Sequence, residues 1–420
     1  MDTLSLRARR AVRHPAAVPR RLSPWRARAA ALREQAALGE RAAALREQAA
    51  LRERAIALRE RAPLERLAAW RRGGRGGSAT GDAPIDVDGL TQGSLEEIEL
   101  TLVAPELPEG SRTADLDGPV HYVVHEPDGD DPPGPPVVCV HGLGGSHANW
   151  HDLGPLLARR HRVFALDLAG HGRTPRAGRS AAVKANRQLL HRFLTEVVGE
   201  PAVLVGNSMG GTIAVLEAAA HPEQVVDLVL IGPAAPRVRT ELPDLAVARQ
   251  AALFAVPGVA EKVLARRRER LGAEGWVREQ MSLTTADVTR VSAEMRRVAV
   301  ELVASRAAGP DAEAAFLEAA RSLVALLARG GAYREHVAAV RQRALVLHGE
   351  LDRLVPVSCS QMLVRQRPDW RLEVLDGVGH VPQIETPRRT AELVLDWLGR
   401  ERPAEPLPVP RSDPFAGGAA

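Results

Sequence analysis

The sequence has little of what marks secreted or membrane-embedded proteins. Only 2 cysteines occur in 420 residues, and two thiols so far apart do not make a disulfide framework. No apolar run approaches the ~18 residues that cross a bilayer, and no apolar signal segment follows the N-terminal arginines. We therefore expect a cytoplasmic protein in which Cys139, within the run VVCV, is a small buried residue.

Metal and nucleotide motifs are scarce as well. No group of His, Cys, Asp and Glu has the spacing typical of metal ligands, so we expect no metal. Glycines 142, 144 and 145 lack both the Gly-Lys-Ser/Thr ending of a phosphate-binding loop and the G-x-G-x-x-G spacing of dinucleotide-binding loops. We expect no cofactor.

Positive charge is concentrated at one end of the chain. The formal net charge is +4, but residues 1–80 hold 19 arginines against 7 acids, a net of +12 that leaves about −8 for the rest. A mildly acidic body argues against nucleic acid as a partner.

The N-terminal part has low complexity. Between residues 27 and 68, leucines recur at alternating spacings of 6 and 7, which predicts a helix with an apolar stripe but no sustained coiled-coil register. This helix is either a solvated extension or a helix for self-association or a membrane surface. With the glycine-rich linker at 71–84, it makes residues 1–90 a basic helical extension, and residues 401–420 form a proline-rich disordered tail.

Short apolar runs alternate with helical stretches between these ends, which predicts an α/β fold with a mainly parallel eight-stranded sheet flanked by helices. The expected strands are 98–103, 120–126, 136–142, 162–168, 202–207, 226–232, 344–349 and 371–377. The first two have no helix-length segment between them and could pair antiparallel.

A long helical insertion interrupts this alternation. About 110 residues separate Pro233 from Arg343, and they hold helical stretches such as 244–256, 292–308 and 311–330 with no convincing strand. An insertion at the carboxyl end of a strand lies over the edge where α/β sheets bind ligands. We expect a core in two parts, 91–233 and 343–400, with 234–342 as a helical cap.

A catalytic pattern follows the central strands. Gly206-Asn207-Ser208-Met209-Gly210 has the Gly-x-Ser-x-Gly form of a sharp strand-to-helix turn that exposes a hydroxyl. A serine needs a histidine base and a third group that orients the histidine. Asp352 and His380 each follow a predicted strand, in the chain order serine, acid, histidine.

An oxyanion would need backbone N–H groups already in place. We assign them to Met209, after the nucleophile, and to Leu143, in the glycine-rich loop of CVHGLGGSHANW.

Other residues compete for these roles. Glu350 is a second acid close to Asp352, and His348 lies before the acid, where a structural role is favoured. His141 and His171 are expected to hold loops by hydrogen bonds. A pocket could be lined by residues that are more often core residues, namely Trp150, Met209, His147, Trp276 and Met281.

Five segments, VHGLGGS, DLAGHGRT, VGNSMGG, GELDRLVP and GVGHVPQIETP, resemble the successive signature segments of the α/β-hydrolase superfamily. The resemblance covers roughly residues 95–400 and points to the cap-bearing branch of esterases, cofactor-free perhydrolases and carbon-carbon bond hydrolases. It implies that Ser208, Asp352 and His380 form the triad, that Leu143 and Met209 supply the oxyanion hole, and that 234–342 is the cap. GNSMGG is similar to the elbow of the carbon-carbon hydrolases, whereas HGLGGS departs from their HGGGPG-like loop.

We therefore expect a serine hydrolase that cleaves a carboxylic ester of a small or medium apolar substrate. A cap rich in Ala, Leu and Val predicts a mainly apolar pocket for an ester or ketone. Serine at 208, rather than aspartate, argues against epoxide hydrolases and haloalkane dehalogenases. The alternatives are a carbon-carbon hydrolase of ring-cleavage-type diketones and a non-catalytic ligand-binding receptor on the same fold.

Overall fold

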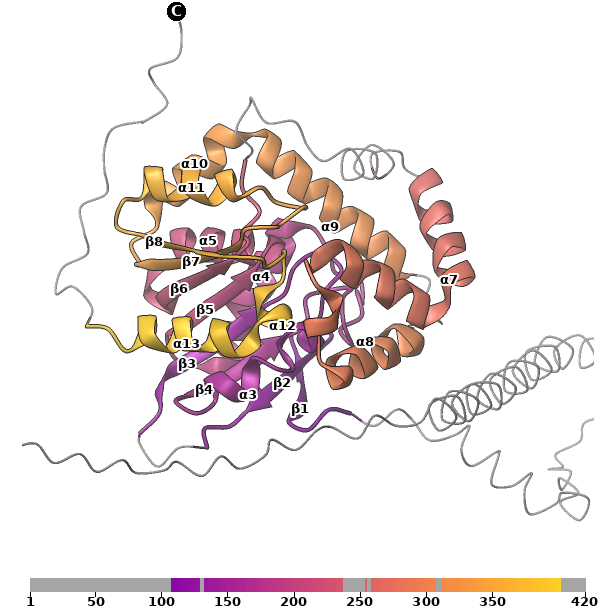
Figure 1. Ribbon diagram of the computed structural model, residues 1–420, viewed down its shortest axis with the longest axis horizontal. Coiled ribbons are helices and arrows are strands. Elements are labelled where there is room, and N and C mark those ends of the chain that lie inside the picture. Colours follow the sequence, from indigo (N-terminus) through magenta and orange to yellow (C-terminus); the bar gives the residue numbers. More distant parts are fainter. Residues whose placement is uncertain (1–106, 129–131, 237–253, 255–257, 307–310, 402–420) are drawn as a thin grey trace, which may run out of the picture. The chain divides into compact units, whose positions relative to one another are not determined.

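The computed structural model describes residues 107–128, 132–236, 254, 258–306 and 311–401 (Figure 1). Several expectations lie outside the described residues: the extension and linker of 1–90, the strand at 98–103, nearly all of the helix at 244–256, and the tail after 401.

One sheet of eight strands forms the centre, in the order β1-β2-β4-β3-β5-β6-β7-β8. From β4 to β8 the neighbours are parallel, and β2 is antiparallel to both β1 and β4. The strands are β1 (Ser111–Asp115), β2 (Pro119–His125), β3 (Gly134–Val140), β4 (His161–Leu166), β5 (Ala202–Asn207), β6 (Val225–Ile231), β7 (Ala344–Gly349) and β8 (Arg371–Leu375). The predicted fold class is confirmed, and β2 to β8 lie within two residues of the predicted strands.

The edge strand β1 is absent from the sequence-based expectation. Its sequence, SRTAD, has no apolar run, and its residues are half-buried or exposed. It forms because the chain turns back through Asp117 and Gly118, both at positive φ, and pairs antiparallel with β2. Pairing with an existing strand, not hydrophobic patterning, therefore places it in the sheet.

Helices cover both faces of the sheet. Alternate strand residues face two separate clusters, so Val138 and Leu204 pack on one side and Val137 and Val205 on the other. Burial on both faces explains why the central strands are apolar throughout instead of alternating with polar residues.

The first face carries α4 (Val183–Phe193), its π-helical continuation η2 (Leu194–Val198), α5 (Met209–Ala220), α10 (Gly330–Ala339) and α11 (Val357–Gln366). The second face carries α3 (Gly154–Leu157) and α13 (Pro387–Leu398), which follows α12 (Pro382–Glu385). Figure 1 shows α13 and α3 on the side of the sheet opposite to α10 and α11. Short 3-10 turns are η1 (His147–Trp150) and η3 (Pro222–Gln224).

The described residues between β6 and β7 are mostly helical. They form α7 (Val259–Thr284), broken by a non-helical residue at Gly272, then η4 (Val288–Arg290), α8 (Ala293–Arg306), α9 (Asp311–Ala328) and α10. Tyr333 and Val337 of α10 belong to the main core cluster. No helix in the described ranges is both long enough and apolar enough to pass through a membrane.

Val346→Ala in β7 is expected to lower the free energy of unfolding by ~2 kcal/mol, because the side chain is fully buried and its loss leaves a cavity. The matched control is Val374→Ala in the neighbouring strand β8, where the valine is 40% exposed; we expect a change within about 0.5 kcal/mol. Thermal and urea unfolding measure both. Equal effects of the two substitutions would contradict this account of the core.

Candidate active site

Ser208 lies at the turn from β5 into α5, with φ 55° and ψ −118°. This is a conformation that costs a non-glycine residue roughly 1–3 kcal/mol and persists only where the surroundings enforce it. A side chain at Gly206 would collide with the carbonyl of Gly210, and one at Gly210 would collide with the carbonyl of Val140. The two glycines of the motif are thus required by close backbone packing, and the serine between them is pushed outward.

Asp352 and His380 are brought together from two loops at the carboxyl edge of the sheet. His380 Nδ1 lies 2.7 Å from Asp352 Oδ2, and the aspartate side chain is fully buried. The backbone N–H groups of Leu354 and Val355 donate to the other oxygen, Oδ1, at 2.9 Å. Burial alone would raise the pKa of Asp352, but attraction to His380 and hydrogen bonds from His348 and His380 hold this pKa well below its usual range. The acid is therefore a fixed carboxylate.

The competing residues occupy other positions. His348 Nε2 lies 3.2 Å from Asp352 Oδ2 and 2.9 Å from the carbonyl of Val355, so this fully buried histidine supports the acid instead of facing the pocket. Glu350 Oε2 accepts from the N–H of Gly377 at 3.0 Å, away from His380. His141 and His171 hold loops: the N–H of Leu168 donates to His141 Nε2, and His171 Nδ1 lies 3.1 Å from the carbonyl of Ala169.

The two backbone groups assigned to an oxyanion lie beside Ser208. Met209 is the first residue of α5, where a helical N–H has no partner within the helix. Leu143 follows Gly142, whose Cα lies so close to Ser208 that a Cβ there would be 3.1 Å from the Ser208 Cβ. Among the described residues, neither the Leu143 nor the Met209 N–H donates a hydrogen bond. Both remain free to bind a ligand oxygen.

A buried carboxylate anchors the loop that carries Leu143. Asp167, fully buried at the end of β4, accepts from the N–H of His147 at 2.6 Å, and the Nδ1 atoms of His147 and His121 each lie 2.8 Å from its Oδ2. The N–H of Arg173 donates to the same oxygen. Burial would raise the pKa of Asp167, but the two histidines hold this pKa far below its usual range. Because its members are distant in the chain, no local motif in the sequence indicates this network.

Two groups in the described part of the chain bring three possible metal-ligand atoms within 4.8 Å of one another: His121 with His147 and Asp167, and His191 with Glu217 and His221. In the first, both Nδ1 atoms are engaged with the carboxylate. In the second, Glu217 pairs with Arg187 at 3.0 Å and with His191 at 2.8 Å. We interpret both as hydrogen-bonded ion networks.

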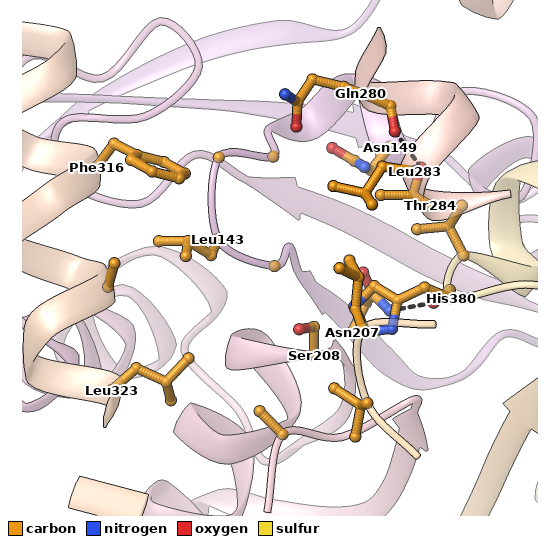
Figure 2. A pocket seen from close by; sticks show the side chains of 18 of the residues that line it. Leu143, Asn149, Asn207, Ser208, Gln280, Leu283, Thr284, Phe316, Leu323 and His380 are labelled. Atoms are coloured by element: carbon orange, nitrogen blue, oxygen red, sulfur yellow. Dashed lines mark hydrogen bonds between the residues drawn. The ribbon is translucent and has the colours of Figure 1, made fainter. Parts of the chain in front are cut away.

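Ser208 and His380 both line one cavity of about 910 Å³, a volume typical of small-molecule sites. Figure 2 shows the Ser208 hydroxyl directed into this pocket, with Leu143, Phe316 and Leu323 on one side and Thr284 and His380 on the other. The wall is mainly apolar and comes largely from α7, α8 and α9.

The pocket residues match the sequence analysis only in part. Trp276 and Met281 line the cavity, although the sequence favoured a core role for them. Trp150 and His147 do not: Trp150 is fully buried in the second core cluster, and His147 binds Asp167. The side chain of Met209 is also part of the core. Gln280, Thr284 and Phe316 line the cavity but carried no signal in the sequence, because they stand on helices outside any motif. Asn149, in the run CVHGLGGSHANW, also lines the cavity and was not among the expected pocket residues.

A mostly parallel eight-stranded sheet with a serine on a strained strand-to-helix turn over its carboxyl edge defines an α/β hydrolase. The family described as alpha/beta hydrolase fold matches residues 135–387, and the chain belongs to it.

Curated relatives include enzymes with two different activities. The pimeloyl-[acyl-carrier protein] methyl ester esterase of Aeromonas hydrophila is 29% identical over 266 residues, which cover 63% of this chain and 96% of the relative. The 2-hydroxy-6-oxo-2,4-heptadienoate hydrolase of Pseudomonas putida is 32% identical over 273 residues, covering 64% and 90%.

Among solved structures, a serine hydrolase of Cycloclasticus zankles superposes with a TM-score of 0.54 at 18% identity over 69% of this chain and 99% of that chain. At this level of identity the superposition supports the fold alone.

Asp167→Asn is expected to lower the free energy of unfolding by about 3–5 kcal/mol at neutral pH, because it leaves buried histidine donors without their carboxylate. The pKa of Asp167 is depressed in the folded state, so its stabilisation is complete above the unfolded pKa of about 3.9 and is lost as pH falls below it. The melting-temperature difference from wild type should therefore shrink below about pH 4. Asp376→Asn, at an exposed position, is the control. A melting-temperature difference between wild type and Asp167→Asn that does not change with pH would contradict the depressed pKa of Asp167.

Proposed function

We propose that the protein is a serine hydrolase that cleaves carboxylic esters of small or medium apolar acids. One observation carries the proposal. Ser208, on its strained turn, and His380, bound to the buried carboxylate of Asp352, open on the same apolar cavity. A nucleophile, a base and an orienting acid are the minimum set for acyl transfer through a covalent intermediate.

In the proposed reaction, Ser208 Oγ attacks the ester carbonyl carbon while His380 takes the hydroxyl proton. The carbonyl oxygen becomes an oxyanion that accepts hydrogen bonds from the N–H groups of Leu143 and Met209. The carbon-oxygen bond to the alcohol then breaks, and His380 returns the proton to the leaving oxygen. Water repeats the sequence on the acyl-enzyme, releases the carboxylic acid and restores Ser208. Asp352 stays ionised and holds the imidazole throughout.

The charge in the pocket favours a neutral substrate. Arg321 is the only arginine or lysine among the described lining residues, and its guanidinium is engaged by Glu261 at 3.1 and 3.2 Å and by the carbonyl of Phe254 at 2.8 Å. Binding an organic anion in an apolar pocket would require a free cation or an array of donors. This observation favours an ester over the carboxylate substrate that the name of the Pseudomonas putida relative implies.

Carbon-carbon bond hydrolysis is the second candidate. It is favoured by the 32% identity to the heptadienoate hydrolase and by the GNSMGG segment at the turn. The same serine, histidine and aspartate would serve, with a carbon leaving group in place of an alcohol.

We also propose a cap that is smaller than the whole insertion. Residues of α7, α8 and α9 line the cavity above Ser208, although α9 also packs in the main core through Ala319 and Leu323. By contrast, Tyr333 and Val337 of α10 pack in the main core, and no described residue of α10 lines the cavity. The cap then consists of α7 to α9 and the segments that join them, and the core resumes at α10.

Initial rates with p-nitrophenyl esters from acetate to decanoate test the proposed reaction. We expect a maximum at a medium chain length, because the cavity can hold an acyl chain, and a loss of about 10⁴-fold or more in Ser208→Ala. Ser282→Ala, at an exposed position on α7, should behave as wild type.

The same variants are assayed with a 2-hydroxy-6-oxo dienoate, whose consumption is followed by absorbance. Faster Ser208-dependent turnover of the dienoate than of any ester would replace the esterase assignment with carbon-carbon hydrolysis. No turnover of either class would favour the ligand-binding receptor.

We propose that the basic segment 1–90 takes no part in hydrolysis. Instead, it mediates either self-association of the protein or binding to an anionic membrane surface. Its deletion should leave ester hydrolysis within about twofold of the full chain and abolish self-association or vesicle binding, because the charge of residues 1–80 is removed. Light scattering measures self-association, and sedimentation with anionic vesicles measures vesicle binding. Loss of hydrolysis in the truncated chain, with the fold intact by circular dichroism, would contradict it.

A further inference from the structure

The proposed ester hydrolysis divides the pocket into two parts, and the inference below rests on that reaction. With the carbonyl oxygen held by Leu143 and Met209, the acyl carbon lies over Ser208. His380 must reach the leaving oxygen to return its proton, so the alcohol part of the ester lies on the His380 side. The acyl chain takes the other side.

The carboxyl-terminal half of α7 forms the His380 side. The N–H of His380 donates to the carbonyl of Thr284 at 2.7 Å. Glu385 links the loop of His380 to the end of α7, because its carboxylate accepts from the N–H of Gly379 at 2.9 Å and from the N–H of Ala286 at 3.0 Å. Gln280 lies one helical turn before Thr284 and also lines the cavity. In Figure 2, Leu283 and Thr284 stand on this side of Ser208, and Gln280 leaves the same helix with its amide reaching over the pocket above Ser208.

The opposite side belongs to α9 and is apolar. A Cβ at Gly144 of the oxyanion loop would lie 3.1 Å from the ring of Phe316, so this helix packs directly on the loop. The further lining residues of α9 are Ala320, Leu323, Val324 and Leu327, together with Arg321, whose charge is paired with Glu261. This half suits a hydrocarbon chain.

Gln280, on the helix that forms the alcohol side, has a polar side chain without a described partner. Thr284 Oγ1 donates to the carbonyl of Gln280 at 2.9 Å, and Asn149 Oδ1 accepts from the N–H of Ser146 at 2.7 Å. Both of those groups are therefore engaged within the protein. The Gln280 amide makes no hydrogen bond to another described residue, although it is half-buried among apolar groups such as Met281 and Leu283. An amide in such surroundings gains from a ligand that pairs with it.

We propose that Gln280 selects the alcohol part of the substrate, and that the substrate class is a monoester of an apolar acid with an alcohol that carries a further hydroxyl group. A hydroxyl both donates and accepts, and an amide offers one acceptor and two donors, so the two groups can form complementary hydrogen bonds. A hydrocarbon alcohol would leave the amide unpaired.

A matched substrate pair tests this assignment. 3-Hydroxypropyl octanoate and butyl octanoate have the same number of heavy atoms and differ by a hydroxyl in place of a methyl group. We expect wild-type kcat/KM to favour the hydroxypropyl ester by roughly tenfold beyond the ratio of their alkaline hydrolysis rates, as one hydrogen bond provides.

The ratio of the two kcat/KM values, corrected for the alkaline hydrolysis rates, should fall to about one in Gln280→Met. Methionine keeps the length of the side chain and removes its hydrogen bonds. The matched control is Gln224→Met, on η3 outside the pocket, which should keep the wild-type ratio. Damage to the fold lowers both rates together and leaves the ratio unchanged, so the ratio reports recognition.

Two outcomes would overturn the inference. Serine-dependent hydrolysis of both esters with a corrected wild-type ratio near one, or with the same ratio in Gln280→Met, would refute the role of Gln280 and leave the esterase function standing. No Ser208-dependent hydrolysis of any ester would refute the proposed function and this inference together.

Discussion

The close approach of α5 to β3 is the constraint on which the site depends. Gly210 lies so near the carbonyl groups of Val140 and His141 that no side chain fits there. The chain can enter α5 from β5 only through a sharp turn, and Ser208 takes the positive φ that this turn requires. Since Val140 leads directly into the loop of Leu143, the same contact sets Ser208 beside the proposed oxyanion donors.

Buried carboxylates hold the loops around this turn. Asp167 ties β2, η1 and the loop at Arg173 to the end of β4, whereas Asp352 ties the loop of His380 to the end of β7. Each carboxylate accepts several donors in a region without solvent, where an ionised group is stable only when it is fully paired. The loops at the edge of the sheet thus gain fixed positions that loop sequences alone do not provide.

The sequence predicts those parts of the molecule in which local pattern and tertiary role agree. Ser208 directly follows the apolar strand β5, and Asp352 and His380 lie in the loops after β7 and β8; parallel topology places these positions at one edge. Strand β1 escapes prediction because pairing, not hydrophobicity, creates it. The network of Asp167 joins residues far apart in sequence, and Gln280 stands in a helix whose polar residues mostly face solvent. In these cases only the packing of distant segments gives the residue its role.

In the proposed reaction, Ser208 carries an acyl group during turnover. Rapid mixing with p-nitrophenyl octanoate, acid quench and peptide mass spectrometry test it most directly. We expect an octanoyl adduct on the peptide that contains Ser208, formed within one turnover and absent in Ser208→Ala. Hydrolysis that continues with no adduct on this peptide, or with an adduct on another residue, would contradict it.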